Sequence, residues 1–139
     1  MALNLHSLTF PFLHSYSGQS AISIPLTLMS APSRYVDLLA KLDTGSTYCI
    51  FSRSYSTLLG LDLYSGIAQR LRTATGAFQT YGHEVTVSVF DLEWQAFVYF
   101  AENDSLSLNV LGRLGFLDRL RVAVVDYDQQ LYLGLHGQQ

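Results

Sequence analysis

The sequence offers few residues for metal or redox chemistry, because it has one cysteine and four histidines. Cys49 has no partner for an intrachain disulfide, so we expect a buried and chemically inert thiol. The histidines are too scattered for a metal site, and neither a zinc ion nor any other cofactor is expected. The Gly-x-Ser-x-Gly pattern of many serine hydrolases is also missing. The histidines are His6, His14, His83 and His136.

Charge is scarce as well. Only 14% of the residues are charged, the formal net charge is −3, and no run of one sign occurs. Because nucleic-acid binding needs a basic surface, we expect no nucleic acid partner. No apolar run is long enough for a membrane helix, so no membrane partner is expected either. Residues 1–20 lack the basic start and apolar stretch of a signal peptide, which predicts a cytoplasmic protein.

What the sequence does have is apolar residues, which make up 49% of the chain. A chain of 139 residues with this composition can bury a core of its own, so we expect one domain over residues 1–139. So few charges beside so many apolar residues also indicate that a second subunit covers part of the surface.

Apolar and polar residues alternate along much of the chain, which is typical of half-buried β-strands. Alternation over residues 22–28, together with the apolar residues between 3 and 12, predicts an opening hairpin that turns at 15–19. Further strands are expected over residues 35–42, 47–51, 69–75, 78–90, 93–100, 121–125 and 130–135, and short helices over 54–60 and 115–120. Many short strands and little helix predict an all-β fold with a closed barrel.

One polar loop interrupts this pattern with chemically useful residues. Asp43-Thr44-Gly45-Ser46 lies between two apolar segments, where a short loop can present a carboxylate rigidly. An ordinary Asx turn explains the same residues, since such a triplet occurs by chance in roughly 5–10% of chains of this length. A second segment, Asn109-Val110-Leu111-Gly112-Arg113, repeats the form of an apolar strand that ends at a glycine.

Together the two segments resemble retropepsin-like aspartic peptidases. Residues 42–46 are similar to the catalytic loop of that family, and residues 110–113 to its later hydrophobic-hydrophobic-Gly-Arg segment. The resemblance covers roughly residues 35–133. It implies a closed retropepsin-like β-barrel with a ψ-shaped pair of loops, a hairpin that forms a mobile flap, and one short C-terminal helix.

The resemblance also implies a role for each matching residue. Asp43 resembles the catalytic aspartate, and Thr44 the residue whose hydroxyl braces two subunits across their axis. Gly45 is the position of close approach, and the Ser46 hydroxyl is expected to donate to the outer oxygen of Asp43. The supporting loop is Leu111, Gly112 and Arg113, and the flap tip that contacts substrate is Thr75, Gly76 and Ala77.

Aspartic peptidase chemistry needs two carboxyl groups, one ionised to activate water and one protonated to hydrogen-bond the scissile carbonyl. The chain has no second Asp-Thr-Gly or Asp-Ser-Gly. The second aspartate therefore has to come from another copy, which predicts a homodimeric endopeptidase that binds an extended peptide across the subunit boundary.

Two other interpretations stay open at the level of sequence. One is a retropepsin-like module that dimerises or binds peptides without cutting them, because a fold does not fix a function. The other is an unrelated β-barrel in which Asp43-Thr44-Gly45-Ser46 occurs by chance.

Overall fold

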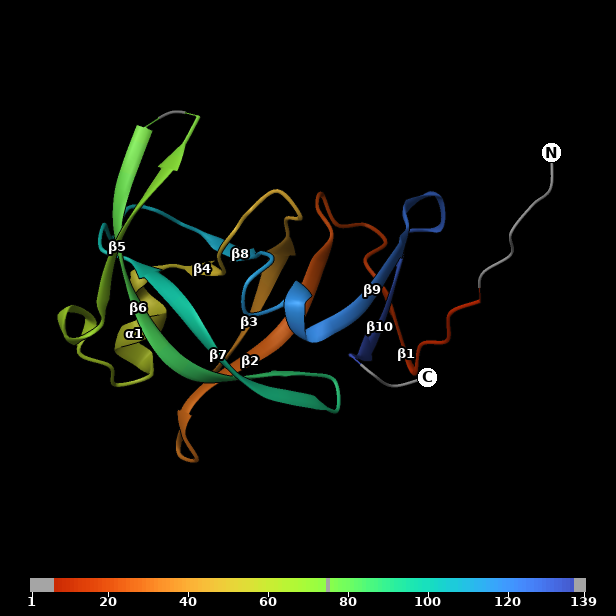
Figure 1. Ribbon diagram of the computed structural model, residues 1–139, viewed down its shortest axis with the longest axis horizontal. Helices are drawn as coiled ribbons and strands as arrows, with labels where there is room; N and C mark the ends of the chain where they lie inside the picture. Colours follow the sequence, from red (N-terminus) through yellow and green to blue (C-terminus); the bar gives the residue numbers. More distant parts are fainter. Residues whose placement is uncertain (1–6, 75, 137–139) are drawn as a thin grey trace.

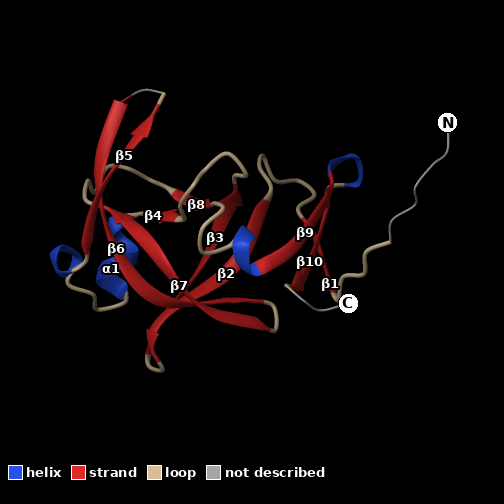
Figure 2. Ribbon diagram, in the orientation of Figure 1, coloured by secondary structure: helices blue, strands red, loops and turns tan. Residues whose placement is uncertain are grey.

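Strands dominate the computed structural model, which describes residues 7–74 and 76–136 (Figure 2). The strands are β1 (Phe12–Ser15), β2 (Ser23–Ala31), β3 (Arg34–Leu42), β4 (Ile50–Phe51), β5 (Ile67–Thr73), β6 (Gly76–Val89), β7 (Leu92–Ala101), β8 (Asn109–Leu111), β9 (Leu120–Val125) and β10 (Gln130–Leu135). The helical segments are α1 (Arg53–Leu58) and the 3₁₀ turns η1 (Leu63–Ser65), η2 (Leu117–Arg119) and η3 (Asp126–Asp128). In the described part of the chain, no helix has the length and apolar character needed to cross a membrane.

Six strands close into a barrel in the order β2-β3-β8-β4-β7-β6, and β6 returns to pair with β2 (Figure 1). The long strand β6 makes this closure possible, because its first half pairs with β5 and its second half with both β7 and β2. β5 lies outside the ring as an edge strand, and the β5–β6 hairpin projects from the barrel. The closed all-β barrel predicted from the sequence is confirmed.

The core follows from the alternation in the sequence, since successive side chains of a strand point to opposite faces. In β2, for example, Ile24, Leu26 and Leu28 are buried while Pro25 is exposed. The largest fully buried side chains are Phe51, Phe100, Phe116, Ile24, Leu28, Leu59, Leu111, Leu131 and Leu133. Most of these residues come from the barrel and the smaller sheet, and Leu59 and Phe116 come from the segments beside α1 and η2. All of them belong to one connected hydrophobic cluster.

The smaller sheet corrects the prediction of an opening hairpin. β1 pairs with β10, which pairs with β9, and β2 pairs with β3 and β6 instead of β1. The physical reason lies at Tyr16, which is buried and whose hydroxyl donates to Asp126 at 2.6 Å. Its backbone N–H also donates to Gln129 O at 3.0 Å, so the chain is tied to the β9–β10 turn before β2 begins.

The two short helices differ in how well they match expectation. α1 lies within the region expected at 54–60, with Gly60 just beyond it in a left-handed conformation at φ 69°. The helix expected over residues 115–120 is only the single 3₁₀ turn η2. Gly115 has φ 99°, and the buried Phe116 points into the core against Trp94 at 5.9 Å between ring centroids. Neither residue is helical, which shortens the segment.

Candidate active site

Asp43 stands where β3 ends, and the backbone around it is well ordered by hydrogen bonds. Its N–H donates to Leu111 O at 2.9 Å, which extends the parallel pairing of β3 with β8 by one step. The Gly45 N–H donates to the Asp43 carboxylate oxygen Oδ1 at 3.0 Å, and the Ser46 N–H donates to Asp43 O at 3.1 Å. The partly buried carboxylate is therefore oriented by the loop that carries it.

A second loop crosses the first one and supports it. β8 lies between β3 and β4 in the sheet. The segment that follows β8 therefore passes behind the loop that joins β3 to β4. The Arg113 N–H donates to Ser46 O at 2.9 Å, and the Leu114 N–H donates to Thr47 O at 2.8 Å. The loops predicted from residues 42–46 and 110–113 are thus joined through their backbones.

Gly112 is required at the point of crossing. A Cβ atom at this position would lie 2.4 Å from Tyr48 O and 2.6 Å from Ser46 O. Both atoms belong to the backbone, so neither can move aside as a flexible side chain would. Leu111 and Gly112, both expected in the supporting loop, are buried.

Cys49 fills the space beneath the two loops. Its sulfur accepts the Gly112 N–H at 3.4 Å, and its thiol donates to Leu114 O at 3.5 Å. Burial raises the pKa of this thiol to about 11, an effect that the Gly112 N–H opposes and the nearby charge of Asp118 increases. A thiol in this state stays protonated and unreactive at neutral pH, in agreement with the inert role expected from the sequence.

Ser46 does not make the hydrogen bond expected of it. Its hydroxyl donates to Tyr48 O at 2.7 Å instead of to the outer oxygen of Asp43. The reason is local, because the turn that bonds the Ser46 N–H to Asp43 O also brings the hydroxyl within reach of the Tyr48 carbonyl. Ser46 therefore stabilises the loop backbone. Among the described residues of the loop, only the Gly45 N–H donates to the Asp43 carboxylate.

Thr44 and Arg113 lie together on the exposed side of the loops. With Leu114, Leu117 and Asp118 they line a shallow hollow beside the Asp43 loop. Within the described ranges the Arg113 side chain has neither an ion pair nor a hydrogen bond, and the Thr44 hydroxyl likewise has no partner. Thr44 is the residue expected to brace two subunits across their axis, and Arg113 belongs to the expected supporting loop.

Strand β5 forms one wall of a cleft, and the segment that follows Asp43 forms the other. Residues of the loop region, from Gly45 to Ile50, face residues 69–72 of β5 across this cleft. Of the predicted flap tip, Gly76 and Ala77 are exposed and begin β6, opposite Thr73 and Arg72. Thr75 lies outside the described residues.

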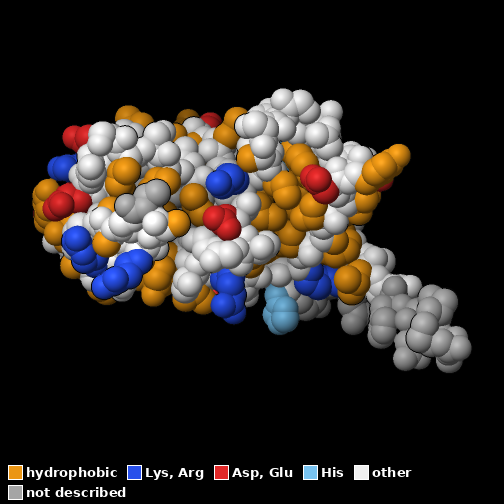
Figure 3. Space-filling view, turned by 90° about the horizontal axis from the view of Figure 1, so that it is seen from above, with side chains coloured by type: hydrophobic (Ala, Val, Ile, Leu, Met, Phe, Trp, Pro, Cys, Tyr) orange, Lys and Arg blue, Asp and Glu red, His pale blue; other side chains and the backbone are white. Residues whose placement is uncertain are grey.

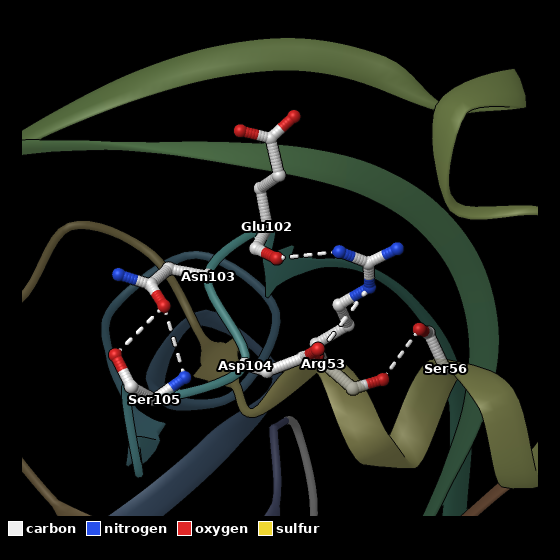
Figure 4. A network of polar contacts seen from close by, with 6 residues as sticks. All are labelled: Arg53, Ser56, Glu102, Asn103, Asp104 and Ser105. Atoms are coloured by element: carbon white, nitrogen blue, oxygen red, sulfur yellow. Dashed lines mark hydrogen bonds and ion pairs between the residues drawn. The ribbon is translucent and has the colours of Figure 1, made fainter.

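A network around Arg53 holds the connection between β7 and β8 and was missed by sequence reasoning (Figure 4). The Arg53 guanidinium donates to Glu102 O at 2.8 Å and pairs with Asp104 at 3.6 Å. At the next step along this connection, the Ser52 hydroxyl donates to Leu108 O at 3.0 Å and accepts the Leu108 N–H at 2.9 Å. The start of α1 thus fixes the segment that leads into β8.

Three other aspartates make structural contacts. Asp118 accepts the Gly115 N–H at 2.9 Å, Asp126 accepts the Tyr16 hydroxyl, and Asp104 pairs with Arg53. No group of three potential metal ligands occurs among the residues that the structure describes. A second carboxyl group in a loop like that of Asp43 is not found in residues 7–74 and 76–136.

Comparison with known proteins identifies the fold. No family model and no curated protein matches the sequence. The structure is similar to EIAV protease solved with the inhibitor HBY-793, with a TM-score of 0.55 and 16% identity over 72% of this chain and 88% of that chain. It is also similar to a retropepsin-like aspartic protease from Rickettsia conorii, with a TM-score of 0.62 and 16% identity over 88% of this chain and 97% of that chain.

The chain therefore has the fold of the retropepsin-like aspartic proteases, which confirms the fold inferred from the two loop segments. At this level of identity the similarity concerns the fold.

The crossing of the two loops makes a testable prediction for Gly112. Replacing Gly112→Ala forces the Ser46 and Tyr48 carbonyls apart, and we expect a loss of about 3 kcal/mol in the free energy of unfolding, measured with urea. Gly134→Ala is the control, because its added Cβ would meet side-chain atoms and no backbone atom, namely those of Pro11, Arg121 and Phe10 at 3.1, 3.6 and 3.9 Å. Equal unfolding midpoints for the two variants would contradict the requirement for glycine at the crossing.

Proposed function

We propose that this protein is an aspartic endopeptidase that works as a homodimer, with one Asp43 from each subunit. The observation that carries the proposal is the presentation of Asp43 at the end of β3, held by Leu111 and Gly45 above a loop that crosses behind it. This geometry occurs in a fold shared with two aspartic proteases.

The chemistry requires a pair of carboxyl groups close together. Two neighbouring carboxylates cannot both hold a negative charge, so the pair shares one proton. The ionised member takes a proton from water, and the water oxygen attacks the scissile carbonyl, to which the protonated member donates a hydrogen bond. The carboxyl group that took the proton from water then donates it to the nitrogen of the scissile bond, and the amine leaves. The pair again has one ionised and one protonated member.

The exposed surface beside the loop supports the supply of the second carboxyl by another copy. The hollow next to Thr44 includes Leu114, which is 46% exposed. On the face seen from above, hydrophobic side chains also gather toward the end of the molecule that carries β1, β9 and β10 (Figure 3). Leu13 and Val125 of this sheet are 56% and 40% exposed. Such a surface suits burial against an identical subunit.

The substrate proposed for this site is an extended peptide. β5 is an edge strand, and its free edge faces the cleft beside the catalytic loop. An extended peptide can add to such an edge through backbone hydrogen bonds. The β5–β6 hairpin would then act as the flap over the peptide, with Thr75, Gly76 and Ala77 at its tip.

The direct test of the mechanism is Asp43→Asn. The amide keeps the shape of the side chain but cannot share or release the proton, so we expect cleavage of an unfolded polypeptide to fall below detection. The wild-type protein is assayed over a pH series from acidic to neutral, and circular dichroism verifies that the variant folds. Wild-type activity in the variant would overturn the mechanism. Peptide binding without cleavage by the wild type at every pH would indicate a binding module instead.

The homodimer is tested by mixing equal amounts of wild-type and Asp43→Asn chains and allowing the subunits to exchange. Random pairing gives about one quarter wild-type dimers and about one half mixed dimers. Each mixed dimer contains a single catalytic aspartate. Activity per wild-type chain is therefore expected to fall to about half, and dilution should reduce it further. Activity that depends neither on the mutant chains nor on concentration would exclude a shared site.

A further inference from the structure

Two arginines stand at the cleft beside the candidate catalytic loop. Arg70 and Arg72 of β5 line the same pocket as Gly45, Ser46 and Tyr48. They are two residues apart on one strand, so their side chains lie on the same face, whereas the buried Leu71 between them points to the other face. Arg70, Leu71 and Arg72 all line this pocket although they point to opposite faces of β5. We therefore place the pocket along the edge of β5 that pairs with no other strand.

Neither arginine has an internal partner to neutralise it. Both are exposed, and within the described ranges their guanidinium groups make no hydrogen bond or ion pair. Arg53, by contrast, is held by Glu102 O and Asp104, and Arg121 donates to Thr9 O.

The neighbours of the two arginines across the hairpin are uncharged. Arg70 lies opposite Gln79 and Arg72 opposite Ala77 on β6. The next acidic side chain across the strands is that of Glu102, whose N–H donates to Gln79 O. In Figure 4 the Glu102 carboxylate has no marked contact, while its backbone carbonyl accepts from Arg53. In Figure 3 the end of the molecule that carries β5 shows Lys and Arg side chains together with Asp and Glu side chains. The cleft thus keeps two free positive charges on one side of an edge strand.

We infer that Arg70 and Arg72 select substrates with acidic side chains, placed two residues apart in the peptide. This inference rests on the proposed peptidase function. A peptide that adds to the edge of β5 directs every second side chain to the face that carries the arginines. A guanidinium matches a carboxylate geometrically and donates two parallel hydrogen bonds to it. The peptide residue between the two acidic ones would lie on the side of Leu71, where an apolar side chain fits.

The first experiment uses blocked decapeptides randomised among Glu, Gln, Lys and Leu, with the products identified by mass spectrometry. We expect Glu to be enriched at two positions separated by one residue. Two peptides are then made that differ only in Glu or Gln at those positions. At low salt the Glu peptide should have a kcat/KM about fivefold higher, because two solvent-exposed charge pairs each contribute modestly. The advantage should shrink in 0.5 M NaCl, where charges are screened.

The variants assign this preference to the arginines. In the double variant Arg70→Gln/Arg72→Gln the ratio of Glu to Gln peptide should fall to about one, and in Arg72→Glu the enrichment should change from Glu toward Lys. Arg34→Gln removes a positive charge at the β2–β3 turn and should keep the wild-type ratio. A Glu to Gln ratio near one in the wild type, or a fivefold ratio that survives in the double variant, would overturn the inference while leaving the peptidase intact.

If the protein cuts no peptide, the proposed function fails and the arginines are tested by binding. Fluorescence anisotropy of labelled Glu and Gln peptides then replaces kcat/KM as the readout. Tighter binding of the Glu peptide, lost in the double variant, would support the role of the arginines in a peptide-binding module. Equal binding of the two peptides would overturn it.

Discussion

The crossing of two backbone loops behind Asp43 is the constraint on which the rest of the site depends. The Ser46 and Tyr48 carbonyls lie so close to Gly112 that no side chain fits between them. The same crossing brings the N–H groups of residues 113 and 114 onto the first loop. Since Asp43 itself donates to Leu111 O, its orientation follows from the position of β8. β8 has only three residues and depends on contacts that lie outside it.

Those contacts explain why residues remote from Asp43 in sequence bear on the site. Ser52 makes two hydrogen bonds to Leu108, and Arg53 holds Glu102 O at the far end of the same connection. The Arg53 guanidinium also lies over the Tyr64 ring, 5.7 Å from its centre, which adds a cation–π contact. The start of α1 therefore acts as a clamp on the segment that enters β8. A barrel strand of three residues can be placed accurately because both of its neighbours and its entry are fixed.

The sequence predicted the barrel well because most strands bury one face, and burial of one face leaves an alternation that can be read directly. It drew attention to the segments around Asp43 and Gly112 because each has a local pattern, and the structure joins these two segments through backbone hydrogen bonds. It failed at residues 3–28, where local turn signals indicated a hairpin but the long-range bond from Tyr16 to Asp126 gives β1 a different partner. The hydrogen bonds of the Ser46 and Arg53 side chains were not predicted for a similar reason. Their acceptors are backbone carbonyls, which every residue has, so the sequence does not mark them.

The charges on β5 connect the stability of the fold with the proposed recognition of substrate. An exposed edge strand invites pairing with other chains, and charged side chains along it discourage such pairing. Arg70 and Arg72 meet this need, because two β5 edges that paired with each other would bring like charges together. For an acidic peptide, by contrast, the same charges are attractive. The free edge of β5 can therefore stay available beside the candidate catalytic loop without pairing with its own copies, provided that its ligand carries the opposite charge.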